Sequence, residues 1–181
     1  MVKITGADLS LETCVKVASM ESQVILDESA RPGMRKSRDF ILDILKSGER
    51  VYGVTTGFGR LAEILIPEKD RGDLQHNLIR SHSAGVGDPM NESEVRIIML
   101  LRANSLARGH SGCREAIVEL LIDFLNQGIH PIVPQFGSVG ASGDLAPLAH
   151  IGLALIGEGD VKYQGRTRPV AEVLEETKLL P

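Results

Sequence analysis

The segment of the chain with the clearest capacity for chemistry is residues 136–150, FGSVGASGDLAPLAH. Its first half consists almost entirely of small residues, and its glycines remove the Cβ crowding that restricts φ and ψ elsewhere: Gly137, Gly140 and Gly143. A backbone of this kind can bend until the nitrogen of Gly143 reaches the carbonyl carbon of Ala141. Loss of water from that adduct and from Ser142 would then give a conjugated five-membered ring made from the chain itself.

The same segment has two more ordinary interpretations. One is a glycine-rich loop that leads into a helix, with Asp144 near the positive end of the helix dipole. The other is a phosphate-binding loop, but the Gly-x-x-x-x-Gly-Lys pattern is absent and no lysine is nearby. The local pattern therefore disfavours a phosphate site and leaves the plain loop and the ring as alternatives.

Residues 51–59, VYGVTTGFG, place a tyrosine beside a second glycine-rich loop. Tyr52 is one of only two tyrosines in the chain, and a phenol beside a mobile loop can belong to an active-site lid. The β-branched residues of this segment favour the alternative, an ordinary half-buried tyrosine on a short strand.

His82 is the second candidate side chain, at the end of an expected helix. It can exchange hydrogen bonds with an imidazole or phenol ring of a ligand, or it can be satisfied by a carbonyl of its own helix. His150 lies inside the expected helix after the glycine-rich segment and is interpreted as structural. The remaining histidines and the cysteines show no metal-ligand spacing and receive no role: His76, His110, His130, Cys14 and Cys113.

Helical periodicity dominates the elements that must position these residues. Between capping residues and terminal glycines, apolar residues recur at helical spacing in segments 11–18, 34–46, 67–82, 92–108, 115–126, 144–156 and 169–179. The expected apolar face of segment 34–46 carries Phe40, Ile41, Ile44 and Leu45.

Strands are expected only as short elements, at 51–58 and in a hairpin at 161–168 around Gln164-Gly165. Residues 129–140 are expected to form a loop. No βαβ alternation is visible, so a nucleotide-binding parallel sheet is not supported. The fold class is therefore mainly α, with short strands.

Composition places the chain among ordinary globular proteins. Hydrophobic residues make up 43% and charged residues 24% of its 181 residues, which argues against a disordered chain. The net charge of −4 gives no general attraction to nucleic acid, and no apolar run approaches the ~20 residues of a membrane span. No signal peptide opens the chain, so a reducing, cytoplasmic location is expected.

The helices have wide apolar faces, and Leu179-Leu180-Pro181 ends the chain without a closing element. Helices of this kind need partners that bury their faces. We therefore expect residues 1–181 to be a fragment of a longer chain.

Residues 140–150, GASGDLAPLAH, resemble the signature of the aromatic amino acid ammonia-lyases and aminomutases. In that family an Ala-Ser-Gly triplet cyclises to 4-methylidene-imidazol-5-one (MIO), and Ala141, Ser142 and Gly143 match the triplet one for one. The resemblance extends over essentially the whole chain. It implies the family's all-helical, fumarase/aspartase-like fold, of which residues 1–181 would be the N-terminal, MIO-bearing region without the C-terminal helical bundle.

The resemblance also implies roles for single residues. Residues 51–59 look like the family's tyrosine loop, which assigns Tyr52 to proton transfer, and Thr55 stands where asparagine is more frequent. Residues 75–87 resemble the substrate-selectivity segment, in which His82 matches the position that faces the substrate ring. Asp144 would tune the electrophile through nearby backbone groups.

The residues SHSAG at 81–85 look most like the family members that act on histidine. The resemblance then implies elimination of ammonia from L-histidine to give trans-urocanate, with no external cofactor, metal, nucleic acid or membrane. A tyrosine ammonia-lyase or a tyrosine 2,3-aminomutase is the alternative, because these enzymes use the same electrophile.

The family builds each active site from more than one subunit, which implies a homotetramer for the full-length protein. It also takes a carboxylate-binding arginine from beyond residue 181. An inactive N-terminal fragment is therefore a further hypothesis for residues 1–181.

Overall fold

A computed structural model describes residues 1–139 and 144–181 of the chain. Its helices are α1 (Leu11–Ala18), α2 (Arg31–Ser47), α3 (Glu68–His82), α4 (Glu92–Ala107), α5 (Glu115–Gln127), α6 (Ala146–Leu155) and α7 (Val170–Thr177), with 3-10 turns η1 (Glu28–Ala30) and η2 (Gly59–Leu61). Its strands are β1 (Val2–Ile4), β2 (Val24–Leu26), β3 (Val86–Pro89), β4 (His130–Pro131), β5 (Pro134–Phe136), β6 (Ser138–Val139), β7 (Asp144–Leu145), β8 (Asp160–Tyr163) and β9 (Arg166–Pro169). The expected mainly α fold with short strands is confirmed.

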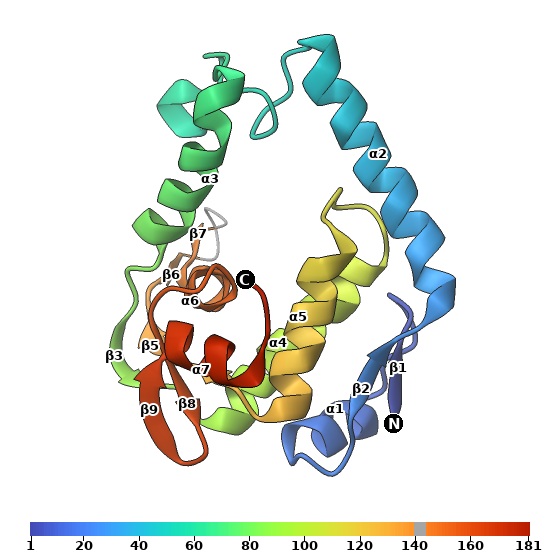
Figure 1. The fold of residues 1–181 in the computed structure, drawn as a ribbon, viewed down its shortest axis with the longest axis vertical. Coiled ribbons are helices and arrows are strands. Elements are labelled where there is room, and N and C mark those ends of the chain that lie inside the picture. Colours follow the sequence, from blue (N-terminus) through green and yellow to red (C-terminus); the bar gives the residue numbers. More distant parts are fainter. Residues whose placement is uncertain (140–143) are drawn as a thin grey trace.

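The body of the structure is built around α4 and α5, which pack against each other with α1 and α6 alongside (Figure 1). Their largest fully buried side chains are Met99, Leu100, Leu121 and Phe124. The helix ends follow the expected local signals: Asn91 and Glu94 form a reciprocal capping box, and Gly128 ends α5 in the left-handed conformation. None of the described helices is long and apolar enough to span a bilayer.

A small parallel unit, β1-α1-β2, closes one side of this body. Val2 of β1 lies opposite Val24 of β2, and the two strands run parallel. The expectation of no βαβ alternation is therefore wrong at this one place. Three-residue strands are too short to show a periodicity in sequence, and the unit lies at the side of a helical core.

Arg96 of α4 ties this unit to the rest of the body. Its buried guanidinium donates to the carbonyls of Val17 and Leu125, each at 2.8 Å, and lies 3.2 Å from Nε2 of His130. Both carbonyls belong to last helical turns, so one cation satisfies the negative ends of α1 and α5. Nearby, Asn126 pairs with both backbone groups of Val24 at 2.8 Å.

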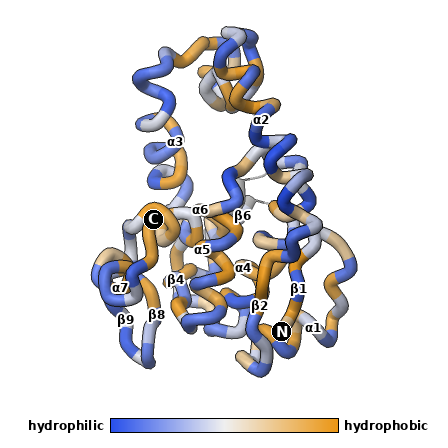
Figure 2. The backbone as a smooth tube through the Cα atoms, turned by 45° about the vertical axis from the view of Figure 1, so that its right-hand side comes forward, coloured by the Kyte–Doolittle hydropathy of each residue, from blue (hydrophilic) through white to orange (hydrophobic). Residues whose placement is uncertain are grey.

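The arch, residues 31–82, rises from the body as α2, a connection over 48–67, and α3 (Figure 1). Residues of α2 and α3 are largely hydrophilic, whereas hydrophobic residues are frequent in β2 and α5 (Figure 2). In α3 no side chain is buried, and in α2 only Met34 and Ile44 are. The expected apolar face of α2 is wrong at Phe40, which is 66% exposed.

The strand expected at 51–58 is wrong, because these residues form a turn. The carbonyl of Val51 accepts hydrogen bonds from the amides of Val54 and Thr55 at 3.0 Å, and Gly53 has a left-handed φ of +70°. Only Thr56 makes an isolated bridge, to Leu65. The hydroxyls of Thr55 and Thr56 donate to the carbonyls of Glu49 and Gly57, so both threonines satisfy the local backbone instead of facing a sheet.

The expected loop 129–140 contains three short strands, β4, β5 and β6, whereas the hairpin expected at 161–168 is confirmed. In that hairpin β8 and β9 pair across Gln164 and Gly165, both with positive φ. The helix expected at 144–156 is α6, Ala146–Leu155, and begins later than expected because Asp144–Leu145 pair as β7 with β6.

Candidate functional site

The candidate electrophile belongs, in sequence, to the segment between β6 and β7, two strands that pair with each other. Val139 pairs with Asp144 and Ser138 with Leu145, in antiparallel register. The four residues between these strands include Ala141, Ser142 and Gly143, which lie outside the described residues. The pairing brings the two flanks of the triplet together.

Two glycines allow the chain to pass closely behind this hairpin. A Cβ on Gly137 would lie 2.9 Å from the Cα of Gly85, and Gly137 has a φ of +138°. A Cβ on Gly85 would lie 3.0 Å from Nε2 of His150 and 3.1 Å from Cβ of Pro134. Larger residues would therefore push β5, β6 and the end of α3 apart.

His150 of α6 contacts the backbone of Gly85 behind the same hairpin. The amide of Gly85 donates to Nε2 of His150 at 3.1 Å, and burial lowers the pKa of His150. A neutral ring is required for Nε2 to accept this hydrogen bond, so the two observations agree. His150 thus has the structural role expected for it: it joins α6 to the segment after His82.

His82 is the last residue of α3 and is half-buried. Its Nδ1 lies 2.9 Å from the carbonyl of Leu78 and 3.0 Å from the hydroxyl of Ser81. A carbonyl can only accept, so Nδ1 carries the proton. The carbonyl partner proposed for a helix-end histidine is therefore present, and the substrate-facing role of His82 stays a prediction.

Tyr52 lies in the connection between α2 and α3 and is 62% exposed. Its ring meets the ring of Phe58 edge to face, with centroids 5.7 Å apart and planes at 76°. A Cβ on Gly53 would lie 2.8 Å from the Phe58 ring. Gly53 is therefore the residue that lets the loop fold Phe58 against its tyrosine.

Thr55 holds this loop together from inside. It is fully buried, and its hydroxyl accepts from the amide of Val51 at 2.8 Å and donates to the carbonyl of Glu49 at 2.6 Å. The amide of Ile66 donates to the Thr55 carbonyl at 2.9 Å. Sequence reasoning noted Thr55 only as a departure from the family and missed this role, which a threonine between two glycines could have signalled.

The structure brings some of the candidates together and keeps one apart. His82, His150 and the β6–β7 hairpin lie at the end of α3 next to the body, whereas the segment 48–67 with Tyr52 lies beyond the other end (Figure 1). A helix of 15 residues such as α3 is about 22 Å long. Within one chain, Tyr52 is therefore not beside the hairpin.

Two cavities lie elsewhere in the described residues. One of about 600 Å³ opens at the start of α4, where Glu92 contacts His130 at 3.2 Å and Lys162 at 2.6 Å. The other, of about 400 Å³, is mostly apolar and lies between α5 and α6. In residues 1–139 and 144–181, no group of His, Cys, Asp and Glu side chains could hold a metal ion.

A histidine ammonia-lyase of Geobacillus thermodenitrificans is 47% identical over all 181 residues, which cover 36% of its length. An ergothionase structure from Treponema denticola superimposes with a TM-score of 0.95 at 36% identity, over 99% of this chain and 36% of that one. The tyrosine aminomutase of Streptomyces globisporus gives a TM-score of 0.92 at 40% identity, over 99% of this chain and 34% of that one.

The chain thus spans about a third of the length of the proteins that it resembles. The family model described as aromatic amino acid lyase matches residues 9–181. That range includes residues 51–59, the end of α3 and the strands β6 and β7. The chain belongs to the aromatic amino acid lyase family.

Proposed function

We propose that the full-length protein is a histidine ammonia-lyase, which eliminates ammonia from L-histidine without oxidation and releases trans-urocanate. The observation that carries this proposal is the 47% identity to a histidine ammonia-lyase along the entire chain. The residues SHSAG at 81–85, which end α3 and lead to β3, support histidine as the substrate.

The electrophile of the proposed reaction is MIO, formed from Ala141, Ser142 and Gly143. The described residues fit such a group, because the pairing of Val139 with Asp144 holds the flanks of the triplet together. Cyclisation requires a strained backbone, and backbone strain persists only where surrounding structure enforces it. When formed, the ring supplies an electrophilic carbon that makes the substrate's amine a better leaving group.

The chain's own side chains would bind the substrate and move its proton. Tyr52, on the loop organised by Thr55, would take the β-proton as general base. His82 would hydrogen-bond the imidazole of the substrate. Asp144 would orient or tune the electrophile through nearby backbone groups.

The position of Tyr52 supports an active site shared between chains. The tip of the arch is far from its own hairpin and exposes several large apolar side chains: Tyr52, Leu61, Ile64 and Leu65. Exposed apolar patches commonly mark interfaces. We propose that the full-length protein is a cytoplasmic homotetramer in which the arch of one subunit completes the site of another.

Residues 1–181 are proposed as the N-terminal, MIO-bearing region, without the C-terminal helical bundle. The relatives are about three times as long, and the arginine that binds the substrate carboxylate in the family would come from beyond residue 181. We therefore expect no detectable turnover from residues 1–181 alone.

The second candidate is a tyrosine-specific lyase or aminomutase. The similarity to a tyrosine aminomutase at 40% identity favours this alternative over others, since His82 can hydrogen-bond a phenol as well as an imidazole.

The test uses the purified full-length protein with histidine, tyrosine and phenylalanine in separate assays. Ultraviolet absorbance should rise for the product of histidine, and the intact mass should show the loss of two waters per chain. Product from tyrosine alone, or a β-amino acid instead of an unsaturated product, would favour the second candidate. An unmodified mass would contradict the MIO proposal.

A further inference from the structure

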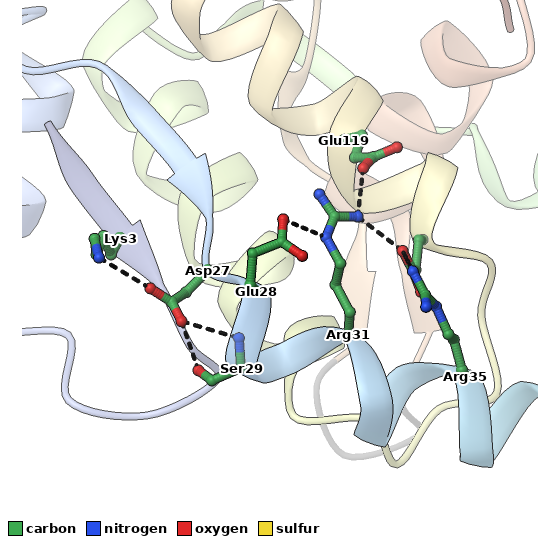
Figure 3. Close-up of polar contacts among 8 residues, drawn as sticks. Lys3, Asp27, Glu28, Ser29, Arg31, Arg35 and Glu119 are labelled. Carbon is green, nitrogen blue, oxygen red and sulfur yellow. Dashed lines mark hydrogen bonds and ion pairs between the residues drawn. The ribbon is translucent and has the colours of Figure 1, made fainter.

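A cluster of charges joins the base of α2 to α5 (Figure 3). One nitrogen of Arg31 donates to Glu115 at 2.7 Å and to Glu119 at 2.6 Å, and its Nε donates to Glu28 at 2.9 Å. Arg35, one turn later in α2, donates to Glu115 at 2.6 Å. These five residues are called the Arg31 cluster below.

The centre of the Arg31 cluster is shielded from solvent. The side chains of Arg31 and Glu115 are only 20% and 19% exposed, so their attraction is screened less than that of a surface pair. Hydrogen bonds from Arg35 and Arg31 lower the pKa of Glu115, and those to Glu119, Glu115 and Glu28 raise the pKa of Arg31. The forked guanidinium suits this geometry better than an ammonium would.

A second set of contacts lies farther along the same side of α2. The amide of Gly112 donates to the hydroxyl of Ser37 at 2.8 Å, and Arg38 donates to the Gly112 carbonyl at 3.3 Å. A Cβ on Gly109 would lie 2.5 Å from the backbone of Gly33. The first half of α2 thus packs against the connection between α4 and α5.

The second half of α2 has no comparable support. Beyond Ile41, its only buried side chain is Ile44, which is not part of the main core. From residue 31 to residue 47, where the turn that carries Tyr52 follows, α2 extends about 24 Å. A rotation of about 5° at its base would move the far end by about 2 Å over that length.

We propose that Arg31, held by Glu115 and Glu119, is a positioning residue for Tyr52: it sets the direction of α2 and thereby the place at which the tyrosine loop meets its substrate. This inference rests on the proposed function, in which Tyr52 takes a proton. Misplacement of a catalytic group by about 1 Å can lower a rate by about 100-fold. A charge cluster far from the reaction can therefore control it.

The test compares Arg31→Met with wild type in the full-length protein, using histidine and β-deuterated histidine. We expect kcat to fall by about 10-fold to 100-fold, with little change in KM. The primary deuterium isotope effect on kcat should rise, because removal of the β-proton becomes slower relative to product release. The mass loss that reports ring formation should stay complete.

The matched control is Arg168→Met. Arg168 also bridges two glutamates, Glu172 and Glu176, but on β9 and α7 rather than on the path to Tyr52. The kcat and the isotope effect of Arg168→Met should equal those of wild type. Arg31→Lys keeps the charge but not the fork, and should recover part of the lost kcat.

Hydrogen exchange of the same proteins gives a readout that needs no activity. Peptides covering 109–114 and 48–56 should exchange faster in Arg31→Met than in wild type. In Arg168→Met their exchange rates should equal those of wild type. If Arg31→Met does not fold, Ser37→Ala removes the acceptor of the Gly112 amide and should show the same pattern more weakly.

An unchanged isotope effect in Arg31→Met, with or without a loss of kcat, would overturn the inference, as would equal losses in Arg168→Met. If wild type forms no product from any of the amino acids, the proposed function fails. The exchange measurement then decides alone whether the cluster holds α2 and the tyrosine loop in place.

Discussion

The body and the arch hold their helices by different physical means. In α5 six side chains are buried, whereas in α3, which is two residues longer, none is. The body is stabilised along the length of its helices by apolar burial. The arch is held at its two ends. The Arg31 cluster and the contacts of Gly112 hold the start of α2, and the hydrogen bond between Gly85 and His150 holds the chain just after α3.

The residues that stabilise the fold therefore lie mainly in the body, whereas Tyr52 and His82, which are proposed to act on the substrate, lie in the arch. Few side chains of the arch are buried, and the strands that flank the Ala-Ser-Gly triplet in sequence follow Gly85 and its contact with His150. Segments of low local stability are those that can adjust to a substrate or a partner subunit. Substitutions in the body should therefore change mainly the free energy of unfolding, and substitutions in the arch should change mainly turnover.

The largest effect is expected from Ser142→Ala in the full-length protein. The methylidene carbon of the ring would come from the Ser142 side chain, so this variant should lose nearly all activity while its circular dichroism stays that of wild type. Normal turnover by the variant would sink the MIO proposal. Unfolding of the variant would place the triplet with the body as a stabilising element.

In the body, Phe124→Ala should lower the free energy of unfolding by about 3–5 kcal/mol, the range for removal of a fully buried aromatic ring. Native-state hydrogen exchange of the α5 amides in the full-length protein measures this. The matched variant in the arch is Phe40→Ala, at a ring that is 66% exposed, and it should change stability by less than about 0.5 kcal/mol. Similar changes in both variants would contradict the distinction between body and arch.

In the arch, Tyr52→Phe should reduce turnover by about 100-fold or more, as expected for the loss of a general base. Its stability should stay within about 0.5 kcal/mol of wild type, because the tyrosine is largely exposed. Steady-state kinetics and thermal unfolding measure the two quantities. A loss confined to KM would mean that Tyr52 binds the substrate and does not move a proton.

The smallest effect is expected at Asp27, where the body passes into the arch. Its carboxylate accepts from the amide and hydroxyl of Ser29 and pairs with Lys3, and these contacts lower its pKa from 3.8 to about 2 (Figure 3). A lowered pKa means that the carboxylate stabilises the fold above pH 3.8, and that this contribution is lost as the pH falls toward 2. The difference in melting temperature between wild type and Asp27→Asn should therefore narrow over that range, and a constant difference would be inconsistent with the assignment.

The elements with local signals were predictable from sequence, and those made by distant pairing were not. Asn91 and Gly128 mark the ends of α4 and α5 because capping needs only neighbouring residues. The strand β3 is VGDP, with every residue exposed, so no alternation could reveal it. Residues 51–58 suggested a strand by composition, but the Thr55 hydroxyl satisfies the backbone of its own turn.

The candidate site divides in the same way. Tyr52, His82 and the triplet could be singled out because their motifs are continuous in sequence. Their separation along α3 could not, since it depends on where both ends of the arch attach to the body. The Arg31 cluster was equally invisible, because Arg31 and Glu115 are 84 residues apart in the chain.

Arg96 and Asn126 also set an order of events during synthesis. The carbonyl of Val17 meets Arg96 of α4 only after 79 more residues have been added, and the backbone of Val24 meets Asn126 at the end of α5 only after 102. At 5–20 residues per second this interval is roughly 5 to 20 seconds. Until then the N-terminal β1-α1-β2 unit leaves the ribosome without its closing hydrogen bonds. A nascent chain stalled before residue 126 would therefore present this unit, without its closing contacts, to chaperones and proteases.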